Sequence, residues 1–182
     1  MPKACVCNRL GLTSIPRNLP ISLHKLDLEV NQIAIIRPGS LAILTHLETF
    51  DVAYNKITII QTGTFAHLPR IQAIYMWNNQ ITMIQSGAFQ NLPQLKYVKF
   101  LDLRSNNISV IPPSAFDLIT YMFRTSMAGN PWNCDCKMIP FRKNIPFFKT
   151  FNLMTKRITC AQPTKLQGYD LKDINPEELI CE

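Results

Sequence analysis

The sequence predicts a solenoid, an α/β fold in which short repeated units stack side by side and each adds one strand to a parallel sheet. Three observations predict it. Asparagines recur with spacings of 24, 24, 27 and 24 residues, at Asn31, Asn55, Asn79, Asn106 and Asn130. Apolar residues fall at the same offsets around each of them. Cysteines occur only near the two ends of the chain, at positions 5, 7, 134, 136, 160 and 181.

Each repeated unit contains the elements that such a stack needs. Alternating apolar residues, such as Leu26 and Leu28 or Phe50 and Val52, predict a short strand with one buried face. The asparagine follows where the chain leaves the strand, and its amide can bond the buried backbone groups of that turn. On the returning segment a second set of apolar residues should form a spine on the convex side: Leu41, Phe65, Phe89 and Phe116.

Composition limits the class of protein. The chain has 182 residues, of which 47% are hydrophobic and 17% charged, a balance typical of one globular domain. It has no run of 18 apolar residues, so no membrane span is expected in this chain. The net charge is +7, but seven basic residues lie together between 137 and 165 without an acid, and the rest is balanced. We therefore expect a local basic cap and no nucleic-acid partner.

The pattern L-x-x-L-x-L-x-x-N-x-L, repeated in phase, resembles the leucine-rich repeat family. The resemblance implies a curved solenoid with the parallel sheet on its concave face and short 3-10 or loop segments on its convex face. It also implies one continuous structural domain with three parts. These are an N-terminal cap at 1–22, four repeats at 23–121, and a partial repeat with a cysteine-rich cap at 122–182.

Sequences at the C-terminal end, NPWNCDC at 130–136 and the segment 160–181, resemble the family's cysteine-rich C-terminal cap. The resemblance implies the disulfides Cys134–Cys160 and Cys136–Cys181. Metal binding is the competing interpretation, but the spacing is C-x-C and no histidine stands nearby, so we expect no metal and no cofactor. Disulfides indicate an oxidising compartment, and hence a secreted or cell-surface protein.

The N-terminal segment resembles the end of the family's N-terminal cap, which normally holds four cysteines, whereas this chain has Cys5 and Cys7. Three possibilities stay open. The two form a strained bond, the family's upstream partners are missing, or a thiol bonds another chain.

Residues on the solvent side of the predicted strands are the first candidates for ligand binding. This face should be polar if it were unconstrained, yet it carries four aromatic residues on neighbouring strands, which is typical of recognition surfaces. Aspartates recur at one strand position, with an arginine beside them, although solvated aspartates would look the same. The predicted ligand-binding residues are Tyr54, Tyr75, Trp77, Phe100, Asp51, Asp102 and Arg104.

Three further features are candidates for surface functions. Basic residues of the C-terminal cap predict an anion site, for which we name Arg142, Lys143, Lys149, Lys156 and Arg157. Three extra residues, 95–97, interrupt the repeat and could be neutral drift, shape the binding groove or form a homodimer contact. The sequon Asn107-Ile108-Ser109 predicts a glycan on Asn107.

A short stack between two cysteine caps is most similar to the variable lymphocyte receptors and related immune-type proteins. The resemblance implies an extracellular ligand-binding protein of the innate-immune or antigen-receptor type. Its expected partner is a microbial surface component, either an anionic glycan such as lipopolysaccharide or a protein. It would bind the concave face with help from the basic cap. The alternative is a cell-adhesion or signalling ectodomain that binds a host protein.

Catalysis is not expected. The three histidines, His24, His46 and His67, fall at unrelated repeat positions, and no serine or cysteine nucleophile is placed to pair with them.

Overall fold

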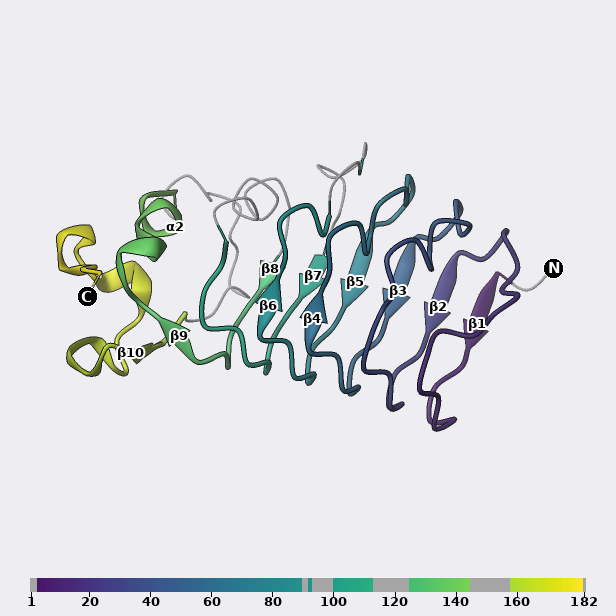
Figure 1. Ribbon diagram of the computed structural model, residues 1–182, viewed down its shortest axis with the longest axis horizontal. Helices are drawn as coiled ribbons and strands as arrows, with labels where there is room; N and C mark the ends of the chain where they lie inside the picture. The colour runs from purple at the N-terminus through teal and green to yellow at the C-terminus, as the bar shows by residue number, and fades with distance from the viewer. Residues whose placement is uncertain (1–2, 90–91, 93–99, 113–124, 145–157, 182) are drawn as a thin grey trace.

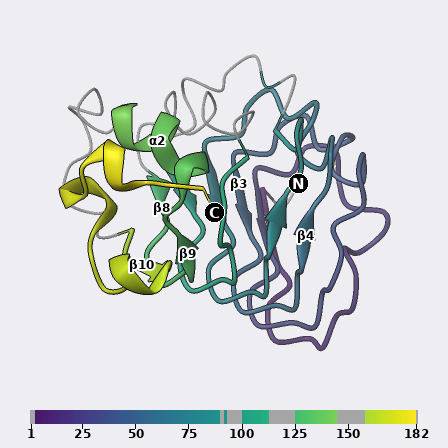
Figure 2. The same ribbon diagram turned by 60° about the vertical axis from the view of Figure 1, so that its left-hand side comes forward.

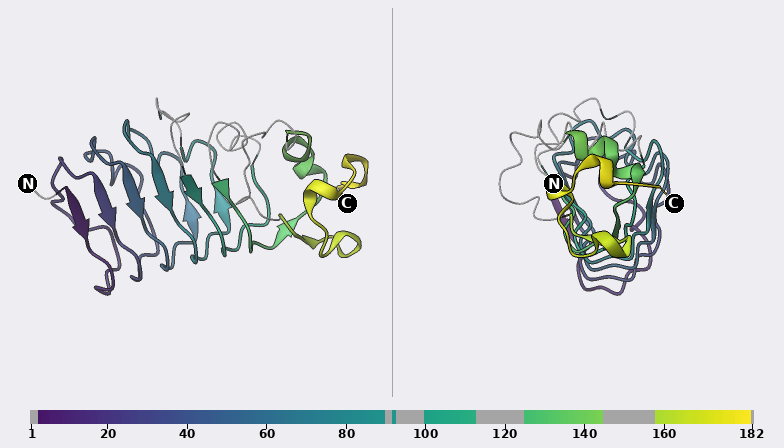
Figure 3. Two further views of the ribbon diagram at one scale, coloured as in Figure 1. Left: turned by 180° about the vertical axis from the view of Figure 1, so that it is seen from behind. Right: turned by 90° about the vertical axis from the view of Figure 1, so that its left-hand side faces the viewer.

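A computed structural model describes residues 3–89, 92, 100–112, 125–144 and 158–181. The chain winds as a solenoid whose two termini lie at opposite ends of the stack (Figure 1). Viewed along the stack, successive turns superimpose (Figure 3, right). This is the predicted leucine-rich-repeat architecture, and its elements follow the repeat in the sequence.

One six-stranded parallel sheet runs the length of the stack in the order β1-β2-β3-β5-β7-β8. Its strands are β1 (Ala4–Val6), β2 (Lys25–Asp27), β3 (Thr49–Asp51), β5 (Ala73–Tyr75), β7 (Phe100–Asp102) and β8 (Thr125–Ser126). The register places Leu26, Phe50, Ile74 and Leu101 beside one another. These central residues are buried because successive side chains alternate between the two faces of a strand. The other side of the sheet, which we call the open sheet face, is the predicted concave surface.

Apolar side chains inside the coil form one continuous core. The predicted convex spine is confirmed for Leu41, Phe65 and Phe89, all buried, and the rings of Phe65 and Phe89 stack with centroids 5.0 Å apart. Phe116 lies outside the described residues. A single repeat could not bury these side chains alone, so the stack depends on contact between neighbours.

The five phased asparagines form the predicted ladder. The Asn79 side chain shows the pattern: its oxygen accepts from the Ile57 N–H at 3.0 Å, and its amide donates to the Val52 and Met76 carbonyls at 3.0 and 3.1 Å. Asn55, Asn106 and Asn130 make the equivalent bonds across adjacent repeats. Each amide therefore satisfies backbone groups that neighbouring turns leave buried.

The residue before each ladder asparagine has a left-handed backbone. Its φ is 55° at Val30, 52° at Tyr54, 52° at Asn78, 53° at Ser105 and 71° at Gly129. Asparagine and glycine adopt this conformation readily, whereas valine and tyrosine adopt it at a cost. The turn geometry is thus imposed by the stack and not by the local residue.

A second, two-stranded parallel sheet was not predicted. It consists of β4 (Ile59–Ile60) and β6 (Met83–Ile84), on the segments that follow the ladder asparagines. Elsewhere among the described residues the returning segments are turns. These turns agree with the predicted 3-10 or loop segments, and the 3-10 helices of the described residues lie in the C-terminal cap.

The C-terminal cap closes one end of the stack (Figure 2). Its elements are β9 (Trp132–Asn133), η2 (Cys136–Met138), α2 (Ile139–Asn144), β10 (Cys160–Gln162), η4 (Thr164–Leu166), η5 (Leu171–Asp173) and η6 (Pro176–Glu178). Disulfides join Cys134 to Cys160 and Cys136 to Cys181, the alternating pairing that the resemblance implies. Trp132 is fully buried and donates its ring N–H to the Met127 carbonyl at 3.3 Å, which ties the cap to the last repeat.

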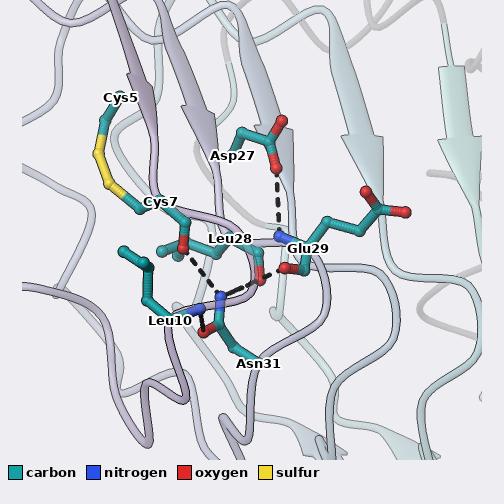
Figure 4. Close-up of a disulfide and its surroundings, with 7 residues drawn as sticks. All are labelled: Cys5, Cys7, Leu10, Asp27, Leu28, Glu29 and Asn31. Carbon is teal, nitrogen blue, oxygen red and sulfur yellow. Dashed lines mark hydrogen bonds between the residues drawn. A yellow bond between two sulfur atoms is a disulfide. The ribbon is translucent and has the colours of Figure 1, made fainter.

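At the N-terminal end, β1 covers the open edge of β2, and Cys5 is bonded to Cys7. Asn31 completes the ladder here, as Figure 4 shows: its oxygen accepts from the Leu10 N–H at 3.1 Å and its amide donates to the Cys7 carbonyl at 3.0 Å. The short N-terminal segment therefore supplies the bonds that a preceding repeat would supply.

Candidate ligand-binding face

Four aromatic side chains lie on the open sheet face, and we call them the aromatic patch: Tyr54, Tyr75, Trp77 and Phe100. Tyr54 and Trp77 meet edge to face, with ring centroids 4.4 Å apart, and Tyr75 and Phe100 meet at 5.3 Å. Tyr54 is 42% exposed and the other three are half-buried. The rings thus support one another while leaving surface for a partner.

Arg104 extends the aromatic patch from the neighbouring repeat. Its guanidinium carbon lies 5.6 Å from the centroid of the Trp77 ring. Its Nε and Nη2 donate to the two carboxylate oxygens of Asp102 at 2.9 and 2.6 Å. This hydrogen bonding raises the pKa of Arg104 further, so the group stays charged at any physiological pH. Asp102 ends β7 and Arg104 follows two residues later, so the two side chains lie on the same face and meet there.

Asp102 differs from its predicted role as a solvent-facing ligand residue, since it is only 1% exposed. Its carboxylate bonds Arg104 and accepts from the Arg104 backbone N–H at 3.1 Å. Asp27 and Asp51 accept in the same way from the N–H two residues on, at 3.2 and 3.0 Å (Figure 4 for Asp27). The repeated aspartates therefore stabilise the turn that follows each strand. Their constant spacing from the ladder asparagine was the signal for this role.

The first two repeats give the open sheet face an acidic half, formed by Asp27, Glu29, Glu48 and Asp51. One basic residue, Lys25 on β2, lies among these acids, and its Nζ is 3.4 Å from the Asp27 carboxylate. Burial raises the pKa of Asp51 to about 6, and the nearby charges of Asp27 and Glu29 add to this. The Ala53 N–H and Lys25 oppose it. Asp51 pairs in register with Tyr75, so the acidic half borders the aromatic patch.

The predicted anion site in the C-terminal cap is described only in part. Lys143 is exposed on α2, but Arg142 is half-buried and donates its Nε to the Ile174 carbonyl at 2.8 Å, a bond within the cap. Lys149, Lys156 and Arg157 lie outside the described residues. The segment η6, which packs against α2, contributes the exposed acids Glu177 and Glu178. The fold therefore brings acids close to a stretch that is purely basic in sequence.

Other predicted features have different outcomes. Asn107 is exposed, as a glycan acceptor must be. The inserted residues 95–97 lie outside the described residues.

Within the described part of the chain, Asp135, Cys136 and Cys181 are close enough to form a metal site, but both sulfurs are in a disulfide. No helix among the described residues is both long and apolar enough to cross a bilayer.

A solenoid with an open, aromatic-rich sheet face defines a class of repeat proteins that bind partners on an extended surface. Comparison with known families identifies this class: the model of the leucine-rich repeat family matches residues 21–81 and 69–130 of the chain. The chain belongs to the leucine-rich repeat family.

Three relatives are similar over less than half of this chain. Leucine-rich repeat-containing protein 52 of Mus musculus is 25% identical over 46% of this chain and 27% of its own length. Platelet glycoprotein Ib beta chain of Rattus norvegicus is 29% identical over 43% of this chain and 38% of its own length. SLIT and NTRK-like protein 4 of Mus musculus is 31% identical over 43% of this chain and 9% of its own length. The matches thus span well under half the length of these relatives.

Proposed function

We propose that this protein is the extracellular binding domain of a receptor-type protein, and that it recognises a protein ligand through the aromatic patch and Arg104. The observation that carries the proposal is the contact chain Tyr54–Trp77–Arg104–Asp102, which crosses three repeats on the open sheet face. Aromatic and arginine side chains held in place offer large contact area at low entropic cost, which is the composition of binding hot spots. Asp102 acts by positioning Arg104.

The charge of the same face favours a ligand that carries a basic residue. Three carboxylates of the first two repeats, Glu29, Glu48 and Asp51, are half-buried on this face, and a fourth, Asp27, is buried and paired with Lys25. A cationic side chain lying between Asp51 and the Tyr75 ring would gain both an ion pair and a cation–π contact. An anionic glycan would be repelled by this half of the face.

The extracellular location is supported by the three disulfides and by a platelet glycoprotein among the relatives. The exposed sequon at Asn107 supports a glycan there. The aromatic patch on the open sheet face supports binding in place of catalysis.

The experiment selects ligands and then maps them. A displayed library of random peptides is selected against immobilised wild-type protein, and the affinity of each recovered peptide is measured for Trp77→Ala and Arg104→Ala. We expect a loss of at least tenfold for each variant, because each removes a central contact. Met83→Ala, an exposed residue on β6 away from the open sheet face, is the matched control and should lose less than twofold. Equal losses for Met83→Ala and Trp77→Ala would refute the site.

The charge argument has its own readout in the same selection. Recovered peptides should be enriched in lysine and arginine, and the enrichment should fall when the selection is repeated on Asp51→Asn. Peptides that bind through Trp77 without any basic enrichment would refute the cation preference and leave the aromatic site standing.

A second candidate is an immune-type receptor of the variable-lymphocyte-receptor kind, which recognises a microbial surface component such as lipopolysaccharide. The exposed basic residues Lys137 and Lys143 favour it. Binding of lipopolysaccharide would then weaken with salt and disappear in the double variant Lys137→Glu/Lys143→Glu. Lipopolysaccharide binding that is insensitive to both changes, or absent, would exclude this candidate.

A further inference from the structure

A groove lies outside the open sheet face, at the N-terminal end of the stack. It lies between two segments. One is residues 14–19 of the N-terminal cap, and the other is residues 35–44, the returning segment of the first repeat. Its volume is about 360 Å³, at the lower end of the range for small-molecule sites. Every residue that lines it belongs to the described part of the chain. We call it the flank groove.

Two isoleucine side chains are exposed here. Ile35 is 53% exposed and Ile43 is 56% exposed, and both line the flank groove with Pro16. The nearby Ile33 and Ile36 are buried. A ligand with an apolar portion would cover the exposed pair and remove it from water.

The charge of the flank groove is of one sign. Arg17 and Arg37 line it from its two sides, both are exposed, and none of the lining residues is acidic. The salt bridges found in the described residues involve neither arginine. Guanidinium groups with free donors bind carboxylates and phosphates in a bidentate manner, and Ser40 adds a hydroxyl on the same wall.

From these observations we propose that the flank groove binds a small amphipathic anion, in which a carboxylate or phosphate head contacts Arg17 and Arg37 and a short apolar chain covers Ile35 and Ile43. The volume suits a single short chain. This site is independent of the aromatic patch, and it takes a ligand of opposite charge from the one proposed there.

Calorimetric titration with octanoate, octyl phosphate and octylamine tests the proposal on the whole protein. The two anions should bind saturably with one-to-one stoichiometry, and octylamine should not. Arg37→Glu should weaken anion binding at least tenfold, whereas Arg70→Glu, the same charge change at an exposed arginine outside the groove, should change it less than twofold. Ile43→Asn should weaken binding relative to Ile21→Asn, a matched change at another exposed isoleucine.

Three results would overturn the proposal. They are no saturable binding of either anion, equal binding of octylamine, and equal effects of the groove variants and their controls. Circular dichroism verifies that each variant is folded, which we expect because all four substituted residues are exposed. Trp77→Ala should bind octanoate normally, so failure of the aromatic-patch proposal would not affect this test.

Discussion

Asp51 lies on β3 among other carboxylates, in a position that costs the folded protein free energy at neutral pH. Burial raises its pKa from 3.8 to about 6, so the folded state holds the proton more tightly than the unfolded state. The cost is therefore absent below about pH 4, grows between about pH 4 and pH 6, and is complete above that. The hydrogen bond from the Ala53 N–H to the Asp51 carboxylate offsets part of this cost.

The first prediction follows from the direction of this pKa shift. Asp51→Asn keeps an oxygen that can accept from the Ala53 N–H but removes the charge. The shift corresponds to at most about 3 kcal/mol, which solvent screening at a half-exposed site reduces to about 1 kcal/mol. We expect urea denaturation to show a gain of about 1 kcal/mol at pH 7.5 and almost none at pH 4. A gain of equal size at both pH values, or one matched by the exposed-site control Glu177→Gln, would contradict it.

Val30 gives a second prediction at the scale of one residue. Its backbone is left-handed, with φ of 55°, and the equivalent residues of other repeats include Asn78 and Gly129. Replacing Val30 with asparagine removes a β-branched side chain from a conformation that costs it about 1–2 kcal/mol. Thermal unfolding of Val30→Asn should therefore show a gain of about 1 kcal/mol. Val6→Asn, the same change at an exposed strand residue in β1, should show no gain, and a gain there as large would disprove the explanation.

Single residues were predicted from the sequence where strand alternation decides their direction, as it does for Tyr75 and Phe100. The burial of Asp102 was not, because it depends on the Arg104 side chain folding back over it. The spacing of two residues between Asp102 and Arg104 was the available signal, but it does not fix the rotamer of the Arg104 side chain.

At the scale of elements, the asparagine ladder carries a third prediction. Asn79→Ala removes one acceptor and several donor contacts from buried backbone groups, among them the Ile57 N–H and the Val52 carbonyl. Each group left unsatisfied costs about 1–3 kcal/mol, so we expect a loss of about 3 kcal/mol or more in denaturant unfolding. Asn107→Ala changes an exposed asparagine of the next repeat and should cost less than about 0.5 kcal/mol. Similar costs for the two variants would contradict the ladder's role.

The C-terminal cap provides a fourth prediction, which concerns its two disulfides. The cysteines of the Cys134–Cys160 bond are buried, whereas Cys181 of the second bond is exposed. Limited reduction followed by alkylation and mass spectrometry should therefore label Cys136 and Cys181 before Cys134 and Cys160. Loss of this bond, which closes 45 residues, should lower the free energy of unfolding by about 4 kcal/mol in the chain-entropy description. Labelling of Cys134 and Cys160 first would mean that the cap opens from its core.

Elements differ in how far the sequence predicts them. Five strands of the main sheet, β2, β3, β5, β7 and β8, follow from the phased apolar residues, since one register satisfies every repeat. The edge strand β1 lies in the N-terminal segment before the repeats and was not predicted. The strands β4 and β6 have two residues each, too few to show any periodicity, so they could not be predicted. In the cap, α2 is six residues long and holds Pro140 in its first turn, where a helix tolerates proline.

At the scale of the whole molecule, the solenoid separates three surfaces. The open sheet face has an acidic half and an aromatic half, the flank groove is basic and apolar, and the cap mixes both charges. The sequence predicted the aromatic patch because stacking puts equivalent positions side by side. It did not predict the flank groove, since that groove depends on how the N-terminal segment packs against the first repeat. The two proposals thus assign ligands of opposite charge to two separate surfaces.

The most direct test of the central claim uses tryptophan fluorescence, because the chain has only two tryptophans. Trp77 lies on the open sheet face, and Trp132 is fully buried in the cap. Saturation with a selected peptide should change the emission of the wild-type protein and leave that of Trp77→Phe, which retains only Trp132, unchanged. An equal change in the wild-type protein and in Trp77→Phe would show that the ligand binds elsewhere, and would contradict the account.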